Sequence, residues 1–370
     1  MNLKEEAQKI LNLADIKIGG DRPWDMIIHD ERVYADVLSK GSVALGETYM
    51  NSWWDSPALD QFFDKLISAN LKEKVRPTFS HLMLYLSAKF FNKQSKKRAF
   101  IVGEKHYDAG NDLYTRMLDK RLTYTCGYWK EAKTLDEAQE AKLDLICKKI
   151  GLKSGDKVLD IGCGWGSFAK FAAEKYGAHV VGITISNEQA KLARELVVGL
   201  PVEIRVCDYR EMNEKFDHII SIGMFEHVGY KNFRTYMEVA NRCLKDDGLF
   251  LLHTIGNNYS DLHTDPWIEK YIFPNGLLPS IAQIGKSIER LFIMEDWHNF
   301  GTDYDKTLMV WNENFEKSWD EIKDKYDERF KRMWNYYLLM CAGSFRARDI
   351  NLWQIVLSKK GVKGGYKSIR

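Results

Sequence analysis

Apolar residues gather in short runs at regular intervals over the C-terminal half of the chain. The runs that suit buried strands lie at 157–161, 179–185, 202–206, 216–223, 248–255 and 352–358. Segments with helical spacing or loop composition separate them. Because strands that alternate with helices pair in parallel, the pattern predicts an α/β fold with a doubly wound, mostly parallel sheet and a small N-terminal domain in front of it.

The helices between these runs are predicted from their end signals. Thr134, with Glu137 three residues later, forms a capping-box pattern at the start of a helix, and Gly151 follows its end. Further helices are expected from about 166 to 176, from about 187 onward, and through the aromatic-rich stretch 303–346. Helix and strand signals therefore alternate, as the doubly wound architecture requires.

The N-terminal part differs from the rest in local charge. Residues 1–69 carry 7 basic and 12 acidic side chains, a net charge of −5, whereas 70–105 carry 9 basic and 2 acidic ones, a net charge of +7. A helix over 79–91 that ends in this basic cluster suits an anionic bilayer surface. A core helix followed by a solvated linker is the alternative interpretation.

Length and composition set the domain organisation. With 370 residues the chain is long enough for two domains, and 45% hydrophobic content supports folded cores. We expect a small N-terminal domain, a basic linker and a catalytic domain, which occupy 1–91, 92–105 and 106–370 respectively.

Several function classes are excluded at this level. Lys and Arg number 54 against 52 Asp and Glu, a net charge of +2, so we expect no nucleic-acid partner. The start MNLKEEAQKI lacks the layout of a signal peptide, and no apolar run has the length of a membrane span. The 6 cysteines are scattered without a C-x-x-C pair, which argues against metal sites and disulfides. These features predict a cytoplasmic protein.

A glycine-rich turn follows the first of the predicted strands. It reads Asp160-Ile-Gly162-Cys-Gly164-Trp-Gly166, so the spacing is G-x-G-x-G and differs from the G-x-G-x-x-G of dinucleotide sites. A carboxylate beside the turn suits a cationic amino group better than a phosphate, which favours the methionine end of S-adenosylmethionine. The P-loop is excluded because no Lys-Ser/Thr pair follows the glycines. A tight strand–helix corner without a ligand is the alternative.

Other strand ends carry polar residues that suit the same ligand. After the second strand, Thr184 and Gln189 offer neutral hydrogen bonds where related sites often have an acidic residue. After the third strand, Asp208 offers an acceptor for an adenine amine and Tyr209 a ring to stack on it. Because the carboxyl ends of parallel strands meet at one edge of the sheet, we expect these residues to surround one site.

A second set of chemically capable residues is expected at the same edge. Glu226 ends the fourth strand, His253 lies inside the fifth, and Tyr304 begins the late helical region. Each alone would be an ordinary core or surface residue. The case for a site rests on their convergence.

Long motifs make the chain similar to bacterial cyclopropane-fatty-acyl-phospholipid synthases. The strings that carry the resemblance are YTCGYW, VLDIGCGWG, VVGITISNEQ, SIGMFEHVG, LLHTIG, DPWIEKYIFPNG, MEDWHNFG and CAGSFRARDINLWQ. They cover 103–358 densely, and the N-terminal domain with its linker also fits the two-domain bacterial form. The mycobacterial mycolic acid methyltransferases are similar over the catalytic part only.

The resemblance implies a reaction and a set of catalytic residues. A methyl group passes from S-adenosylmethionine to a cis double bond of a phospholipid acyl chain, and ring closure follows through a carbocation that a bound bicarbonate deprotonates. By position, five residues would hold this bicarbonate, namely Cys126, Glu226, His253, Ile255 and Tyr304. Ile255 would contribute its backbone, and Cys126 would hold the anion without acting as a nucleophile.

The resemblance also implies ligand and partner contacts. Residues carried over to the cofactor site are Tyr124, Gly162, Gly164, Thr184, Ile185, Gln189 and Tyr209, to which the argument above adds Asp160 and Asp208. His106-Tyr107-Asp108 would lie near the cofactor or acyl chain, and aromatic residues of 256–300 would wall a lipid tunnel. A homodimer with peripheral contact to a phospholipid bilayer, at the inner face of the membrane, is expected.

Two other functions remain open at this stage. A related S-adenosylmethionine methyltransferase that acts on a small-molecule amine would keep the glycine turn but would need no anion site. An inactive lipid-binding module would need neither, and the presence of Glu226, His253 and Tyr304 argues against it.

Overall fold

The computed structural model describes residues 2–71 and 111–370. The helix expected over 79–91, the basic linker over 92–105 and the His106-Tyr107-Asp108 motif lie outside the described residues. Within the described part of the chain, no helix combines the length and apolar character needed to cross a membrane.

A seven-stranded sheet forms the centre of the catalytic part, with the strand order β5-β4-β3-β6-β7-β9-β8. Its strands are β3 (Lys157–Ile161), β4 (His179–Thr184), β5 (Val202–Val206), β6 (Phe216–Ile222), β7 (Leu244–Asn257), β8 (Ile293–Asn299) and β9 (Ile350–Ser358). Strands β3 to β7 pair in parallel, whereas β9 runs antiparallel between β7 and β8. The doubly wound, mostly parallel sheet is confirmed.

The strand order reverses beside β3, because the chain passes outward through β4 and β5 and then returns to β6 on the other side. Open α/β sheets bind ligands in the crevice at such a reversal, beyond the carboxyl ends of the strands. The sequence pattern did not predict β8. β8 lies at the edge of the sheet, where Ile293 and Met294 are 48% and 38% exposed. Because an edge strand is only partly buried, its sequence need not contain a continuous apolar run.

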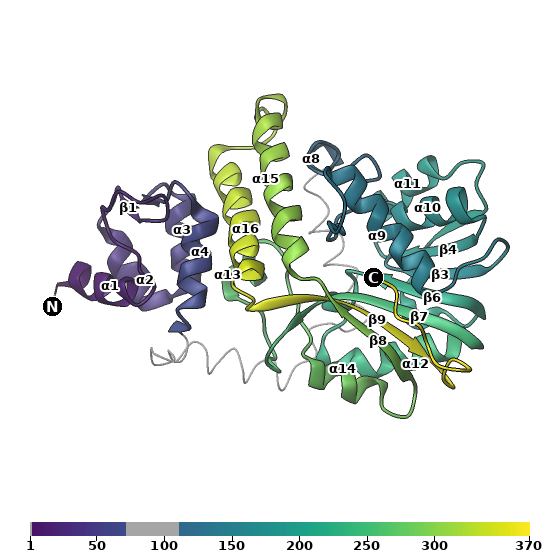
Figure 1. Ribbon diagram of the computed structural model, residues 1–370. Helices are drawn as coiled ribbons and strands as arrows, with labels where there is room; N and C mark the ends of the chain where they lie inside the picture. Colours follow the sequence, from purple (N-terminus) through teal and green to yellow (C-terminus); the bar gives the residue numbers. More distant parts are fainter. Residues whose placement is uncertain (1, 72–110) are drawn as a thin grey trace.

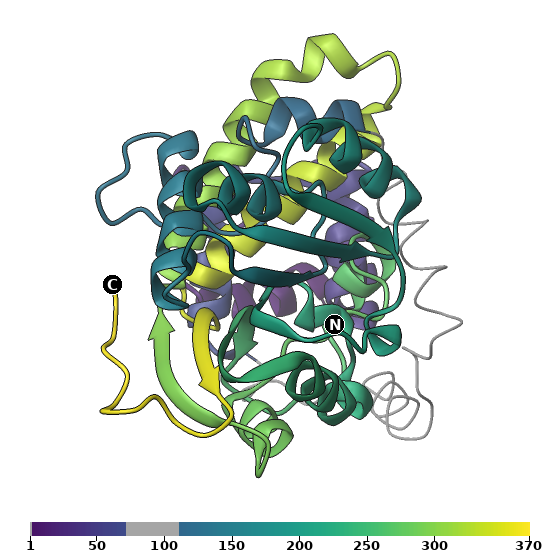
Figure 2. The ribbon, with the colours of Figure 1, turned by 90° about the vertical axis from the view of Figure 1, so that its right-hand side faces the viewer.

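Helices cover both faces of the sheet (Figures 1 and 2). One face carries α9 (Leu135–Lys149), α10 (Ser167–Tyr176) and α11 (Asn187–Leu196), and the other carries α12 (Phe233–Cys243) and α14 (Ile281–Ile288). The predicted capping box is confirmed, because Thr134 Oγ1 accepts from the N–H of Glu137 and the Glu137 carboxylate accepts from the N–H of Thr134.

The N-terminal helices pack on the late helical pair (Figure 1). They are α1 (Leu3–Asn12), α2 (Arg32–Lys40), α3 (Ser42–Met50) and α4 (Leu59–Ser68), with a two-stranded sheet of β1 (Ile27–Ile28) and β2 (Trp54–Asp55). The pair is α15 (Thr302–Ile322) and α16 (Glu328–Arg346), preceded in the chain by the short α13 (Pro266–Tyr271) and, earlier, α8 (Asn111–Met117).

One hydrophobic core joins these two groups of helices. It contains Phe62 and Phe63 of α4 together with Tyr336 of α16, and the Phe63 and Tyr336 rings lie 5.0 Å apart. Gly343 lets α4 approach α16, since a Cβ there would lie 2.7 Å from Phe63 Cβ. Arg346 adds an ion pair to Asp60 at 2.6 Å. The described N-terminal residues therefore share their core with the catalytic part, and an independent domain over 1–91 stays a prediction.

Candidate active site

The glycine turn between β3 and α10 adopts a backbone that other residues disfavour. Gly162, Gly164 and Gly166 have φ of 84°, 54° and 82°. A Cβ on Gly162 would lie 2.6 Å from Met224 Cγ, so this glycine permits close packing against the residues after β6. A Cβ on Gly164 would meet no atom within 4 Å. The turn is thus tight on its inner side and open at Gly164, where its backbone can face a ligand.

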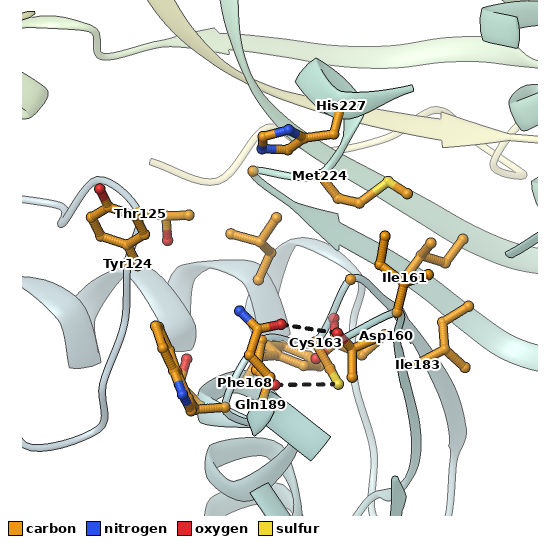
Figure 3. Close-up of a pocket in the computed structure, with 18 of the residues that line it drawn as sticks. Tyr124, Thr125, Asp160, Ile161, Cys163, Phe168, Ile183, Gln189, Met224 and His227 are labelled. Atoms are coloured by element: carbon orange, nitrogen blue, oxygen red, sulfur yellow. Dashed lines mark hydrogen bonds between the residues drawn. The ribbon is translucent and has the colours of Figure 1, made fainter. Parts of the chain in front are cut away.

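A cavity lies at the carboxyl ends of β3, β4, β5 and β6 (Figure 3). All nine positions expected to contact the cofactor line it, namely Tyr124, Asp160, Gly162, Gly164, Thr184, Ile185, Gln189, Asp208 and Tyr209. Tyr124 reaches the cavity from the loop before α9, whereas the others lie at or shortly after the carboxyl ends of β3, β4 and β5. The structure brings these residues together, and their contacts with a cofactor stay a prediction.

Two buried ionisable groups of opposite type line this cavity. The Asp160 side chain is 2% exposed and its Oδ2 has no hydrogen-bond partner among the described residues. Burial raises the pKa of this carboxyl to about 7. Lys142, from α9, is fully buried and its Nζ donates to Thr125 Oγ1 at 2.8 Å. Burial lowers the pKa of Lys142 to about 8.

Side-chain hydrogen bonds organise the side of the cavity formed by the residues after β4 and β5. Thr184 Oγ1 donates to Gln189 Oε1 at 2.9 Å, which orients the Gln189 amide so that its N–H groups remain available as donors. Asp208 accepts from Arg210 Nε at 2.8 Å and from the Arg210 N–H at 2.9 Å. The carboxylate is therefore paired with a guanidinium, and its expected contact with an adenine amine stays a prediction. Tyr209 packs 5.0 Å from the ring of Tyr236.

The second candidate set centres on Glu226, in the short helix η2 (Phe225–His227) after β6. Its Oε1 accepts from the backbone N–H of Ile255 in β7 at 2.7 Å, whereas its Oε2 is buried without a partner among the described residues. Burial raises the pKa of Glu226 to about 7. His227, the next residue, lines the cofactor cavity, so Glu226 lies directly beside it.

His253 is held in a defined state by a neighbour on the adjacent strand. It lies in β7 opposite Gln354 of β9, and Gln354 Nε2 donates to His253 Nδ1 at 3.3 Å. Burial lowers the pKa of His253 well below its ordinary value, so the ring is neutral. Because Nδ1 accepts, the single ring proton is on Nε2, which is buried without a partner among the described residues.

Tyr304 and Cys126 complete this set. Tyr304 lies in the first turn of α15 and stacks on Phe345 with ring centroids 4.6 Å apart. Burial raises its pKa well above the ordinary value, and the nearby Cys126 thiol and Glu226 carboxyl act in the same direction. The Cys126 thiol is fully buried, donates to the Gly127 carbonyl at 3.1 Å and has a pKa raised well above its usual range by burial. A protonated thiol is a poor nucleophile, and the anion-holding role of Cys126 stays a prediction.

We call Glu226, His253, Ile255, Tyr304 and Cys126 the anion cluster. Its polar atoms comprise a neutral N–H donor on His253, a neutral hydroxyl on Tyr304 and a carboxyl oxygen on Glu226 that lacks a partner. This combination fits a small oxyacid that offers both an O–H and acceptor oxygens. Ile255 was expected to contact the anion through its N–H, and the structure gives that N–H to Glu226.

Three residues near the site were not identified from the sequence. Gln354 reads as one polar residue in an apolar strand, and only the pairing of β7 with β9 places it on His253. Thr307 accepts from the Gly127 N–H at 3.1 Å and from Trp129 Nε1 at 2.9 Å, and so fixes the loop that carries Cys126. Of the three, Lys142 is the one that the sequence could have revealed, because a lysine on the apolar face of a helix is unusual.

The aromatic residues expected to wall a lipid tunnel do not form one group. Trp267 packs 4.4 Å from Tyr336 of α16, ring centroid to centroid. Trp297 packs 4.8 Å from Trp353 of the neighbouring strand, in a different core cluster. Phe273 alone lies beside the site, 5.8 Å from His227. A tunnel wall built from these residues stays a prediction.

Comparison with known proteins gives a consistent set of relatives. Residues 94–355 match the family described as mycolic acid cyclopropane synthetase. The cyclopropane-fatty-acyl-phospholipid synthase of Escherichia coli is 54% identical over 364 residues, which span 98% of this chain and 95% of that protein. A tuberculostearic acid methyltransferase of Mycobacterium tuberculosis is 32% identical over 92% of this chain and 84% of its own length.

Solved structures agree with these sequence relatives. A cyclopropane synthase from Mycobacterium tuberculosis is 31% identical and superposes with a TM-score of 0.66, covering 70% of this chain and 98% of that one. A mycolic acid cyclopropane synthase complexed with S-adenosylhomocysteine and CTAB is 32% identical, with the same TM-score of 0.66 and the same coverage, 70% of this chain and 98% of that one.

Proposed function

The chain belongs to the mycolic acid cyclopropane synthetase family, and from that premise we propose that it bridges a cis double bond of an unsaturated phospholipid acyl chain with a methylene group from S-adenosylmethionine. It is an S-adenosylmethionine-dependent methyltransferase of the cyclopropane synthase type. The observation that supports the phospholipid reaction is that Glu226 and His253 each bury a polar atom that has no partner among the described residues, on elements next to the cavity. Glu226 precedes the lining residue His227, and His253 pairs with the lining residue Ile222.

The first chemical demand of this reaction is positioning. An alkene is a weak neutral nucleophile, so the sulfonium methyl must be held in line with it. The methionine end of the donor would lie at Asp160 and the glycine turn, which the cavity places beside Met224 and His227. Attack breaks the bond from sulfur to the methyl carbon, S-adenosylhomocysteine leaves, and a carbocation remains on the neighbouring carbon of the acyl chain.

The second demand is shelter for this cation. Tyr304 and Phe345 are both buried and stacked, so an aromatic wall and exclusion of water are available next to Glu226. The Glu226 carboxyl is buried, accepts from the Ile255 N–H and has the neutral Thr254 hydroxyl beside it, and its charge when ionised would stabilise a cation strongly in such surroundings.

The third demand is a base for the proton that leaves the new methyl group as the ring closes. The anion cluster fits bicarbonate, which would supply that base when bound. Glu226 Oε2 would accept its O–H, while His253 Nε2 and the Tyr304 hydroxyl would donate to its oxygens. Ile255 would act through Glu226 by fixing the carboxylate, and Cys126 would lie beside Tyr304.

The test is incubation of the chain with vesicles of dioleoyl phosphatidylglycerol, S-adenosylmethionine and bicarbonate, followed by mass analysis of the acyl chains. We expect a gain of one CH2 per modified chain together with loss of the alkene. Unchanged lipid with a methylated small-molecule amine would instead assign the chain to the alternative methyltransferase reaction. Vesicle binding without any turnover would leave only the inactive lipid-binding function.

Access to lipid in a bilayer requires a docking surface. We propose peripheral contact with the inner face of the membrane through the 70–105 stretch, whose net charge is +7. Its basic residues lie outside the described part of the chain. Charge reversal at Lys96, Lys97 and Arg98 should abolish sedimentation with anionic vesicles at low salt and leave binding of S-adenosylhomocysteine intact. Unchanged sedimentation would overturn this assignment.

The family resemblance is also the basis on which we propose a homodimer. Light scattering at micromolar concentration is expected to give twice the chain mass of 43.0 kDa. A monomer mass at all concentrations tested would contradict the proposal.

A further inference from the structure

Lys142 is a buried lysine that the reaction scheme above leaves unused. It lies in α9, its side chain is fully buried, and it lines the cofactor cavity. The Nζ donates to Thr125 Oγ1 at 2.8 Å, and Thr125 belongs to the same cavity wall as Tyr124 (Figure 3). One hydroxyl is poor compensation for an ammonium group removed from water.

The acidic residues nearest to Lys142 do not neutralise it by direct contact. Asp119 and Asp160 both interact electrostatically with Lys142, whereas among the described residues the hydrogen bond of its Nζ goes to the neutral Thr125 Oγ1. The Asp119 carboxylate accepts instead from the N–H groups of Thr123 and Arg121 at 2.7 and 3.0 Å. Asp160 keeps Oδ2 without a partner. The cavity therefore contains an incompletely paired cation and an incompletely paired carboxyl.

We propose that Lys142 binds the carboxylate of the methionine end of S-adenosylmethionine, while Asp160 faces its amino group. The α-amino acid end of this ligand is a zwitterion, so a cavity with one buried group of each sign matches it in charge. Removing both ligand charges from water is then compensated by the opposite charges of the protein. The proposal rests on the assignment of Asp160 to the amino group.

A role in the anion cluster is the main competing interpretation. Lys142 also lowers the pKa of His253 through its charge, so it lies near that cluster as well. Two observations favour the cofactor. Lys142 and its acceptor Thr125 line the cavity, and the cavity lining does not include Glu226 or His253. Gln139, one turn earlier on α9, donates to the Thr125 carbonyl at 2.6 Å. This neutral side chain already holds Thr125 in place, so the charge of Lys142 is not needed for that purpose.

The test is a cycle of two ligands and two chains, read by calorimetric binding. The ligands are S-adenosylhomocysteine and its decarboxylated analogue, which keeps the amine and lacks the carboxylate. In the wild-type chain we expect the carboxylate to improve affinity about 10- to 100-fold. In Lys142→Met this preference should fall to about 2-fold or less, because the partner of the carboxylate has been removed.

Two further variants separate charge from packing. Lys142→Arg keeps the charge and should retain part of the preference for the carboxylate. Lys149→Met is the matched control, because Lys149 is a second buried lysine of α9 that bonds His298 at 3.0 Å and does not line the cavity. We expect Lys149→Met to bind both ligands as the wild-type chain does.

The outcomes distinguish this inference from the proposed function. An unchanged preference for the carboxylate in Lys142→Met overturns the inference. If the same variant also has a raised apparent KM for bicarbonate, Lys142 belongs to the anion cluster instead. If Lys142→Met fails to fold, the absence of any carboxylate preference in the wild-type chain still overturns it. Failure of the proposed function would appear separately, as wild-type chain that binds S-adenosylhomocysteine but leaves lipid unmodified.

Discussion

The cavity and the residues proposed to hold an anion bury their polar groups in different ways, although His227 of the cavity lining directly follows Glu226. The cavity is lined by groups of both signs, Asp160 and Lys142, each incompletely paired. In the cluster, Glu226 accepts from the Ile255 N–H and His253 accepts from the Gln354 amide, and both partners are neutral. The cavity therefore complements the charges of a zwitterionic ligand, whereas the cluster contains neutral hydrogen-bond donors beside one titratable carboxyl.

This difference predicts which quantity each region affects, ligand affinity or the rate of turnover. Buried charges that match a ligand contribute to affinity, because they are fully compensated once the ligand is bound. Neutral donors and a carboxyl placed where charge develops contribute to the rate, because their interactions strengthen in the transition state. We therefore expect changes in the cavity to alter binding of S-adenosylhomocysteine, and changes in the cluster to alter turnover.

The largest separation is expected for Glu226→Gln. The amide cannot carry the negative charge that the reaction needs, so turnover at saturating cofactor should fall about 10³-fold. The affinity for S-adenosylhomocysteine should stay within about 2-fold of wild type, because Glu226 is not part of the cavity lining. Steady-state rates and calorimetry measure the two quantities. Equal losses in both would mean that the two regions are one site.

A somewhat smaller loss of turnover is expected for Gln354→Glu. A carboxylate at this position accepts from Nδ1, so the neutral ring of His253 loses its proton on Nε2 and can no longer donate into the cluster. We expect turnover to fall about 10²-fold, and nitrogen NMR of the His253 ring to show the other tautomer. Gln354→Met, which has a similar size and no donor, is the control and should lose less. An unchanged tautomer would show that Gln354 does not position the ring.

For the cavity, we expect Asp160→Asn to lower the affinity for the ligand and to leave turnover nearly unchanged, the reverse of Glu226→Gln. Loss of the buried carboxylate should weaken binding of S-adenosylhomocysteine about 10-fold, while turnover at saturating donor changes little. The neutral variant keeps the size of the side chain, so packing around the glycine turn is preserved. A fall in turnover with unchanged affinity would contradict the assignment of Asp160 to the ligand amino group.

The smallest effect is expected from pH, and it sharpens the same distinction. Turnover needs the ionised Glu226, whose pKa is about 7, so at fixed bicarbonate and saturating donor it should rise up to about 10-fold from pH 6 to 8. Donor affinity needs ionised Asp160, with a pKa of about 7, and protonated Lys142, with a pKa of about 8. Affinity should therefore peak between these values and decline on both sides. Glu226→Gln should keep this affinity profile.

The parts of the site that could be predicted from sequence are those carried by local pattern. Each buried strand indicates where its carboxyl end lies, and parallel pairing brings those ends to one edge, so Asp160, Thr184 and Asp208 could be expected around one cavity from the pattern alone. Tyr124, which lies on a loop before α9, was expected there only from the family resemblance. The positive φ of Gly162 and Gly164 follows from residue type and spacing. The capping box at Thr134 and Glu137 is likewise encoded within four neighbouring residues.

Other features depend on contacts between residues far apart in the chain. The edge strand β8 has no apolar run of its own, and it forms because β9 offers it a partner. Gln354 reaches His253 only through the register of β9 on β7, and Ile255 gives its N–H to Glu226 because β7 passes beside η2. The shared core of α4 and α16 joins segments that the sequence analysis assigned to separate domains.

The amino-acid sequence by itself determined the sheet class, the glycine turn, the kind of ligand and the residue types available for chemistry. These depend on periodicity and local backbone preference, which are short-range. Only the tertiary structure decided which polar atoms are paired, which are buried without a partner, and how far burial moves the pKa of Asp160, Glu226 and Lys142. Desolvation and hydrogen bonding depend on every neighbour in space, and a linear pattern does not contain those neighbours.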